Sequence, residues 1–356
     1  MDKALLFTTL VIFPFGQIAK IGQVSFLDIL IFLIAIYTLL RKSKFPKWYP
    51  YLLGFILFGL FSWIINAFII KNDLIFKGLL YGIRLLIYSI IPVFISNFFK
   101  TKQDKVFILN SLLLISIFTA VFGWIQYFGW PNLISLKYLG WDDHYYRLVG
   151  TFLDPSFTAI IFVLGSTIAL KENKKNSLIF LAISILFTYS RASYLVLILL
   201  LIYFKKYLLI LLFIISIFFL PKNMGGEGVN LTRTSSTNLK IINYKETLEI
   251  IKKSSAIGVG FNNLCPARQI YLNDINTSSH SCFGSDSSIL FIIATTGIIG
   301  LMLFLTFIFS ISSFPLLTIS FLTVLIHSTF SNSLFYPWVM FWLFVLLGLG
   351  GKVNRK

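Results

Sequence analysis

Long apolar stretches separated by short polar or basic segments make up most of this chain. A membrane-spanning helix needs roughly 20 mostly apolar residues in a row. Runs of this kind lie at about 4–19, 23–40, 50–70, 74–98, 106–128, 152–170, 286–309, 314–332 and 334–350, and a less regular apolar block covers 177–220. The pattern predicts an all-α polytopic membrane protein with about 11–12 transmembrane helices.

The apolar block at 177–220 has an awkward length. About 28 residues from Ser177 to Phe204 separate two basic clusters, which is long for one span and short for two. We predict two half-length helices that meet near Arg191, because non-helical backbone at membrane depth is tolerated where it lines a cavity or is covered by protein. A single long span is the alternative, and it would reverse the orientation of everything that follows it.

Basic residues follow alternate spans. They are Arg41, Lys42, Lys44, Lys47, Lys100, Lys102, Lys105, Lys171, Lys174, Lys175, Lys205, Lys206, Lys352, Arg355 and Lys356. By the positive-inside rule, a cytoplasmic N-terminus places all of them in the cytoplasm and the polar stretch at 221–285 outside it. We therefore expect an N-terminal membrane domain at 1–220, an extracytoplasmic loop at 221–285 and a C-terminal membrane domain at 286–356.

The composition excludes a soluble globule. The chain is 57% hydrophobic and only 12% charged, whereas soluble domains are about half apolar and about a quarter charged. The formal charge of +17 would indicate a nucleic-acid partner for a soluble protein, but here the basic residues anchor loops, so no nucleic acid is expected. The apolar start of the chain is interpreted as a first span or an uncleaved anchor, because no small-residue cleavage site follows it.

The polar stretch at 221–285 contains one amphipathic segment. Ile241, Tyr244, Leu248 and Ile251 recur at helical spacing. We expect this helix on the membrane surface or at the mouth of the bundle. The glycines that follow, in 258–261, indicate a turn or a close backbone approach.

Three arginines outside the basic clusters are candidates for binding an anion. Arg84 lies inside an apolar segment, where a charge costs at least about 2.5 kcal/mol and marks a pathway or a ligand unless it reaches the interface. Arg147 closes an external loop. Arg191 is flanked by hydroxyl residues, and its guanidinium could bind a phosphate bidentately. Interfacial anchoring is the alternative for Arg191.

His280 and Asp286 bracket the start of the helix expected at 287. The N-terminus of that helix would carry partial positive charge suited to a phosphate. Histidine is the natural proton acceptor near neutral pH. A solvated loop histidine without a chemical role is the alternative for His280.

The external loop at 129–148 carries aromatic and acidic residues. Trp141 and Tyr145 could stack on sugar rings, or belong to an aromatic belt at the membrane interface. Asp142, Asp143 and His144 could hold a divalent ion against a diphosphate. No third partner for such an ion is identifiable, so no metal site is predicted.

Both cysteines, Cys265 and Cys282, lie in the polar stretch. In an oxidising compartment they could pair, and the closed loop would stabilise the segment by roughly 3 kcal/mol and hold His280 near the helix start. Two free thiols are the alternative.

Several short motifs occur in an order that resembles the O-antigen polymerase and ligase superfamily of bacterial membrane glycosyltransferases. They are Arg147–Pro155 (RLVGTFLDP), Tyr189–Ser193 (YSRAS), Arg233 before an amphipathic helix, Gly258–Phe261 (GVGF), His280–Gly300 ending in GIIG, and Asn332–Pro337 (NSLFYP). Each motif is loose, and their order around one long external loop is more specific. They cover most of the chain from about 145 onward.

The resemblance implies a GT-C-like fold and transfer of a glycan from a polyprenyl diphosphate, with inversion and without a metal or cofactor. Arg191 and Arg233 would bind the diphosphate, and Arg147 and Arg84 would make further substrate contacts. His280 or Asp286 would take the proton of the acceptor hydroxyl. The expected partners are undecaprenyl-diphosphate-linked oligosaccharide, membrane lipid and a chain-length regulator, on the outer face of the bacterial inner membrane.

The resemblance favours the polymerases (Wzy), which join lipid-linked repeat units of O-antigen or capsule, over the ligases, which transfer glycan to lipid A core. Ligases carry a His-Asn pair about eleven residues before the Gly-Ile-Ile-Gly-like step, and here Asp286 occupies that position. A lipid-oligosaccharide flippase is a further alternative. It is disfavoured because many transporters have matched halves, and here the polar insertion is late and unpaired. A purely structural membrane protein would leave the external Arg and His residues unexplained.

Overall fold

The computed structural model describes residues 1–70, 75–139, 141–221, 226–277, 279–311 and 314–350. Its helices are α1 (Asp2–Ile12), α2 (Phe26–Leu40), α3 (Tyr49–Ile69), α4 (Ile75–Tyr88), α5 (Ile91–Phe98), α6 (Lys102–Gly129), α7 (Pro155–Lys171), α8 (Lys175–Thr188), α9 (Arg191–Tyr203), α10 (Tyr207–Phe218), α11 (Ser235–Lys253), α12 (Leu264–Tyr271), α13 (Ser288–Ser310), α14 (Pro315–His327) and α15 (Pro337–Gly350). Short 3₁₀ turns are η1 (Phe13–Ile18), η2 (Ile134–Leu139), η3 (Gly150–Phe152), η4 (Gly226–Val229) and η5 (His280–Phe283), and β1 (Lys20–Ile21) pairs with β2 (Val24–Ser25) in an antiparallel hairpin.

The prediction of an all-α polytopic membrane protein is confirmed. Among the described residues, four helical stretches are long and apolar enough to cross a membrane, at 49–69, 75–98, 102–129 and 288–310, and shorter apolar helices accompany them. The stretch at 75–98 consists of α4 and α5, which are separated at Ser89 and Ile90. Pro92 lies in the first turn of α5, where proline fits, whereas in a continuous helix it would remove a hydrogen bond.

The predicted break near Arg191 is present. Helix α8 ends at Thr188, Tyr189 adopts a left-handed conformation (φ 53°), and α9 begins at Arg191. After α10, the chain returns to the same place, because the Tyr189 hydroxyl donates to the Pro221 carbonyl at 2.8 Å. The block at 177–220 therefore folds as three short helices, and the segment after α10 returns to the break between α8 and α9.

Basic segments from different parts of the chain gather at one end of the bundle. The Asn97 amide donates to the Lys44 carbonyl at 2.8 Å and its oxygen accepts from the Lys44 N–H at 3.1 Å. Lys105 is close enough to Lys171 for their charges to interact. The clusters that follow α2, α5 and α7 therefore share one end, as the charge pattern predicts. The cluster at 352–356 lies outside the described residues.

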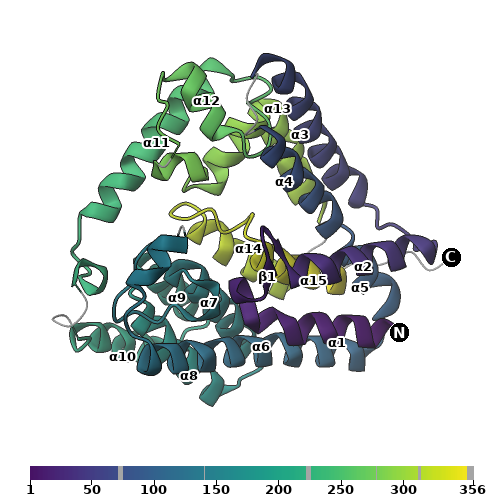
Figure 1. The fold of residues 1–356 in the computed structure, drawn as a ribbon. Helices are drawn as coiled ribbons and strands as arrows, with labels where there is room; N and C mark the ends of the chain where they lie inside the picture. Colours follow the sequence, from purple (N-terminus) through teal and green to yellow (C-terminus); the bar gives the residue numbers. More distant parts are fainter. Residues whose placement is uncertain (71–74, 140, 222–225, 278, 312–313, 351–356) are drawn as a thin grey trace.

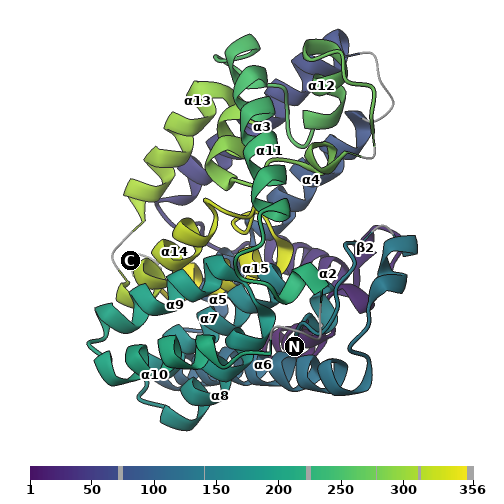
Figure 2. The ribbon, with the colours of Figure 1, turned by 90° about the vertical axis from the view of Figure 1, so that its left-hand side faces the viewer.

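The helices form two parts that meet around the segment between α14 and α15. Figures 1 and 2 show α3, α4, α11, α12 and α13 in an upper part, and α1, α2, α6 to α10 and α15 in a lower body. Helix α7 lies at the centre of the lower body, where every residue from Thr158 to Leu170 is buried. In the upper part α13 packs along α3.

Two glycine motifs that lie far apart in the sequence interlock in the upper part. Helix α13 is interrupted at Gly297 (φ 65°, ψ −170°). The backbone groups left free there bond to the chain at 255–260: the Ile298 N–H donates to the Ser255 carbonyl at 2.9 Å, and the Gly260 N–H donates to the Thr295 carbonyl at 2.8 Å. Backbone groups at membrane depth need such partners. The polar segment is thereby anchored into the bundle.

Replacing Gly297 by alanine should destabilise this anchor strongly. An added Cβ would lie 2.1 Å from the Ala256 carbonyl oxygen, at a φ that side chains rarely adopt. Backbone strain alone costs of order 1–3 kcal/mol. We expect a large loss of monodisperse protein in fluorescence-detected size-exclusion chromatography. Gly54→Ala in α3 is the matched control, because an added Cβ there meets nothing within 4 Å; equal yields of the two variants would contradict the prediction.

Helix α11 forms where the amphipathic pattern predicts it, but its inward face is polar. The buried residues of α11 are Asn243, Thr247 and Ile250, while Ile241 and Leu248 are 44% and 45% exposed. The contact with the bundle is therefore made mainly by side chains outside the apolar stripe. Ile241 and Leu248 stay available to a membrane surface, which was one of the two predicted locations, whereas the Tyr244 hydroxyl donates to the Thr329 carbonyl at 2.6 Å.

Candidate active site

The break between α8 and α9 collects guanidinium groups from distant segments. Arg147 Nε donates to the Thr188 carbonyl at 3.0 Å, and its Nη2 lies 3.5 Å from the Tyr189 carbonyl. Arg233 Nη2 donates to the same Tyr189 carbonyl at 3.2 Å. These carbonyls end α8, where a helix has unsatisfied acceptors and favours positive charge. The broken backbone thus holds two arginines side by side.

Arg191 is the first residue of α9 and reaches the start of α11. Its Nη1 donates to the Arg233 carbonyl at 3.1 Å, and its Nη2 donates to Thr237 Oγ1 at 2.9 Å and Ser236 Oγ at 3.2 Å. The predicted residues Arg147, Arg191 and Arg233 are therefore brought together. We call these three residues the arginine cluster.

The arginine cluster has no carboxylate partner within ion-pair distance among the described residues. Burial, and after it the charge of Arg233, lower the pKa of Arg147 to about 9. At this pKa Arg147 stays protonated at neutral pH. Burial and then Arg191 likewise lower the pKa of Arg233. Asp154, Asp142 and Glu227 interact with the cluster only from beyond ion-pair distance, so an anion such as a diphosphate would stabilise the three crowded cations.

Lys240 on α11 adds a fourth cation that the sequence analysis did not single out. Its ammonium donates to the Phe330 carbonyl and lies 3.4 Å from Ser331 Oγ. Burial lowers the pKa of Lys240, Asp286 opposes this effect, and Arg191 adds to it. Lys240 is therefore within electrostatic range of both the arginine cluster and Asp286.

His280 and Asp286 form one hydrogen-bonded pair. His280 Nε2 lies 2.8 Å from Asp286 Oδ2. The pKa of His280 is raised, mainly because the Asp286 carboxylate stabilises the imidazolium, and partial burial opposes this effect. The side chain of His280 is 38% exposed and that of Asp286 17%, so the imidazole remains accessible. The sequence left open which of the two residues is the base, and the structure joins them in one unit.

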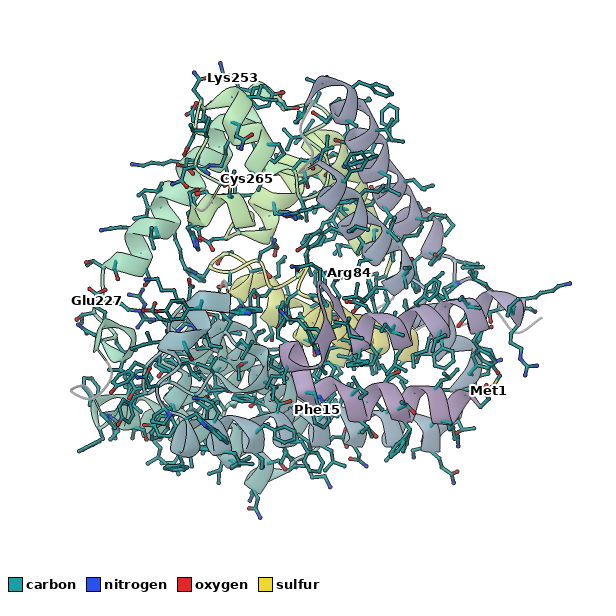
Figure 3. The ribbon with its side chains drawn as sticks, in the orientation of Figure 1. Met1, Phe15, Arg84, Glu227, Lys253 and Cys265 are labelled. Carbon is teal, nitrogen blue, oxygen red and sulfur yellow. A yellow bond between two sulfur atoms is a disulfide. The ribbon has the colours of Figure 1, made fainter. Side chains whose placement is uncertain are left out.

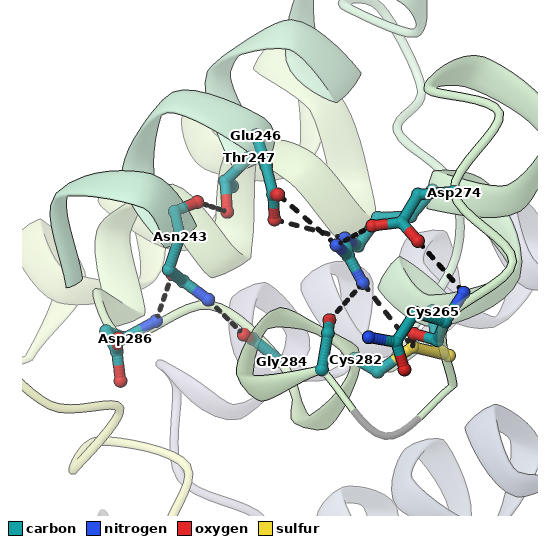
Figure 4. Close-up of polar contacts among 11 residues, drawn as sticks. Asn243, Glu246, Thr247, Cys265, Asp274, Cys282, Gly284 and Asp286 are labelled. Atoms are coloured by element: carbon teal, nitrogen blue, oxygen red, sulfur yellow. Dashed lines mark hydrogen bonds and ion pairs between the residues drawn. A yellow bond between two sulfur atoms is a disulfide. The ribbon is translucent and has the colours of Figure 1, made fainter. Parts of the chain in front are cut away.

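Asn243 on α11 fixes the backbone of this pair. Its Oδ1 accepts from the Asp286 N–H at 2.9 Å and its Nδ2 donates to the Gly284 carbonyl at 2.8 Å (Figure 4). Ser287 then caps α13 by accepting from the Leu290 N–H at 3.5 Å. Asp286 is therefore held at the entrance of α13, as the sequence predicts.

A disulfide and a buried arginine support the turn that carries His280. Cys265 and Cys282 are bonded across 17 positions. Arg268, 2% exposed, pairs with Glu246 at 3.1 Å and also with Asp274 (Figure 4). The disulfide joins η5 to α12, and the Arg268–Glu246 pair joins α12 to α11, so the position of His280 depends on both contacts.

Reduction of the disulfide should loosen this turn without unfolding the bundle. Closure of a loop of this size contributes about 3 kcal/mol, all within the segment between α12 and α13. We expect a reductant to accelerate proteolysis within 264–287 of the full-length protein in membranes. A Cys265→Ser/Cys282→Ser variant should be cleaved fast with or without reductant. An unchanged cleavage rate of the wild type on reduction would contradict this role.

Arg84 lies apart from the arginine cluster. Its Nε pairs with Asp28 of α2 at 2.9 Å, and the Tyr88 hydroxyl donates to the same carboxylate at 2.9 Å. Figure 3 shows Arg84 near the centre of the molecule, far across it from Glu227, which precedes Arg233. The intramembrane charge of Arg84 is thus satisfied by joining α4 to α2.

The predicted sugar-stacking residues lie on the loop that leads to Arg147. Lys20 of β1 lies over the ring of Trp141, at 5.1 Å from its centroid. Tyr145 packs edge-on against Tyr146. Asp142 of this loop is within electrostatic range of His280. Among the described residues, no group of three or more His, Cys, Asp or Glu side chains is arranged to hold a metal ion.

Fold and site together define a multi-pass membrane protein with a cationic cluster suited to an anion and an accessible acid–base pair. Residues 177–305 match the family model Wzy_C, described as O-Antigen ligase. The match runs from α8 into α13 and includes Arg191, Arg233, Lys240, His280 and Asp286. It confirms the resemblance to the O-antigen polymerase and ligase superfamily, whose members are glycosyltransferase-like enzymes.

No curated protein and no solved structure matches the chain in these comparisons. The GT-C-like character of the fold therefore stays a prediction. The division into domains at 220 and 285 and the roles of the individual site residues also stay predictions.

Proposed function

We propose that this protein polymerises undecaprenyl-diphosphate-linked oligosaccharide repeat units into a surface polysaccharide, O-antigen or capsule, on the outer face of the bacterial inner membrane. The single observation that carries the proposal is the arginine cluster, which forms no ion pair with a carboxylate among the described residues and is linked electrostatically through Lys240 to the His280–Asp286 pair. A diphosphate leaving group needs cations, and an acceptor hydroxyl needs a base. The arginine cluster would meet the first need and the His280–Asp286 pair the second, and Lys240 interacts electrostatically with both groups.

The arginine cluster would bind the diphosphate of the donor. Of the five N–H donors of each guanidinium, Arg191 uses four and Arg233 uses three on backbone and hydroxyl acceptors. We assign the Nε–H of Arg191 and the two remaining donors of Arg233 to phosphate oxygens. Fixed charges of this kind stabilise the negative charge that develops as the glycosidic bond to the diphosphate breaks.

The His280–Asp286 pair would serve the acceptor. Neutral His280 accepts the proton of the acceptor hydroxyl while that oxygen bonds to the anomeric carbon of the donor. The electron pair of the breaking C–O bond moves to the diphosphate oxygen, and Asp286 stabilises the imidazolium that forms. One displacement inverts the anomeric configuration, and the step needs no metal ion.

An O-antigen ligase is the second candidate, because the matching family model carries that description. The same site would then transfer the glycan to lipid A core. Asp286 at the position where ligases carry histidine favours the polymerase. A chain-length regulator is a partner to be expected for a polymerase only.

A deletion strain separates these functions. Loss of the polymerase should leave single repeat units on the surface lipid and no long chains. Loss of a ligase should leave a polymer attached to undecaprenyl diphosphate and none on the surface lipid. Repeat units that accumulate on the cytoplasmic face would indicate a flippase and contradict the proposal.

A further inference from the structure

A continuous chain of buried polar side chains leads from the α8–α9 break to the end of α14. Ser190 Oγ lies 3.0 Å from Ser193 Oγ, which lies 3.0 Å from His327 Nε2. His327 Nδ1 lies 2.7 Å from Ser333 Oγ. All four side chains are at least 97% buried. Both ring nitrogens of His327 are therefore engaged inside the apolar body.

Ser190, the first residue of this hydrogen-bonded series, does not cap its helix in the usual way. Ser190 occupies the N-cap of α9. An N-cap serine usually accepts a hydrogen bond from a backbone N–H of its helix, but the side chain of Ser190 accepts none. Its hydroxyl is committed to Ser193 instead. Ser190 is also the residue between Tyr189 and Arg191, so the chain starts at the backbone that holds the arginine cluster.

The other end of the chain is the segment between α14 and α15, residues 328–336. The Ser288 N–H donates to the Ser328 carbonyl at 2.9 Å, and Ser288 Oγ donates to Asn332 at 2.8 Å. Ser288 is the first residue of α13, two positions after Asp286. The same segment supplies the acceptor carbonyl for Lys240. The 328–336 segment is therefore attached to the acid–base side of the site.

We propose that His327 is a positioning residue that sets the arginine cluster relative to the His280–Asp286 pair. It connects Ser193, on the helix that begins with Arg191, to Ser333, on the segment that holds the start of α13. Diphosphate binding and proton transfer occur on opposite sides of this connection. The inference rests on the proposed function, because it assigns the two sides to donor binding and to acceptor activation.

Two amide substitutions separate the two links of His327. The side-chain amide of glutamine reaches the position of Nε2, so His327→Gln can keep the link to Ser193. The amide of asparagine reaches the position of Nδ1, so His327→Asn can keep the link to Ser333. His327→Leu fills much of the same space and keeps neither. Ser320→Ala is the matched control on α14, because Ser320 is fully buried and its hydroxyl has no partner among the described residues.

The test measures binding of undecaprenyl diphosphate to the purified full-length protein and polymer made per folded protein in a complemented deletion strain. Loss of a buried hydrogen bond corresponds to about tenfold in an equilibrium or rate constant. We expect His327→Gln to bind within about threefold of the wild type but to make about tenfold less polymer. His327→Asn should bind about tenfold more weakly, His327→Leu should show both losses, and Ser320→Ala should show neither.

Two results would overturn the inference alone, with the wild type still binding undecaprenyl diphosphate. One is wild-type binding and polymer yield in both amide variants. The other is an equal loss of affinity in all three His327 variants, which a packing role would produce. Failure of the wild type itself to bind undecaprenyl diphosphate would contradict the proposed function, and the inference with it.

Discussion

Alanine at Arg191 or Arg233 is expected to reduce polymer formation about 10²–10³-fold, with the protein still present in the membrane. These two guanidiniums would stabilise the negative charge of the leaving diphosphate, and no carboxylate in the described part of the chain forms an ion pair with them. The measurement is the length and amount of surface polysaccharide in a complemented deletion strain, normalised to membrane protein.

Lysine at the same positions tests the reason for the effect. Arg191→Lys keeps the positive charge but cannot bridge the Arg233 carbonyl and Thr237 with one planar group. We expect most of the activity to be lost in this variant too. Lys245→Ala removes an exposed charge from the same helix α11 and should leave polymer formation unchanged. Normal polymer from Arg191→Ala or Arg233→Ala would exclude the diphosphate role.

Replacement of His280 by glutamine should lower the rate by about 10²–10⁴-fold, the usual effect of losing a general base. The base must be neutral, so the wild-type rate should rise with pH through the raised pKa of His280. Asp286→Asn removes the main cause of that raised pKa. The midpoint of the pH–rate profile should therefore move to lower pH, and the maximal rate should fall because the imidazolium loses its partner.

The pH–rate profile of each variant in membrane vesicles checks this prediction. The His280→Gln variant should lose the rise entirely. A midpoint that stays in place in Asp286→Asn would show that the carboxylate does not govern the titration. Full activity of His280→Gln would assign the proton to another group.

The span pattern and the α8–α9 break could be predicted because apolar length and charge spacing are local properties of the chain. The basic clusters at 174–175 and 205–206 are too close in sequence for two full spans. Two half-length helices that meet at a break keep both clusters on the same side of the membrane. The approach of Arg147 and Arg233 to one carbonyl of Tyr189 could not be derived, because it depends on contacts between segments about 40–90 residues apart.

Other parts of the site carry no sequence signal that separates them from their neighbours. Lys240 resembles Lys245, Lys252 and Lys253 of the same helix, and only its packing against the 328–336 segment distinguishes it. The contact between His280 and Asp286 arises within an irregular loop, where no helical or strand periodicity predicts which way a side chain points. The buried polar face of α11 is explained by Asn243, which must satisfy the backbone at Gly284 and Asp286.

The most direct test of the account is reconstitution of the purified full-length protein in liposomes with an undecaprenyl-diphosphate-linked repeat unit as the only substrate. We predict a ladder of longer lipid-linked glycans with release of undecaprenyl diphosphate, and no ladder from the Arg191→Ala protein. If the correctly folded protein leaves the repeat unit unextended, or extends it only onto lipid A core, the polymerase account is wrong.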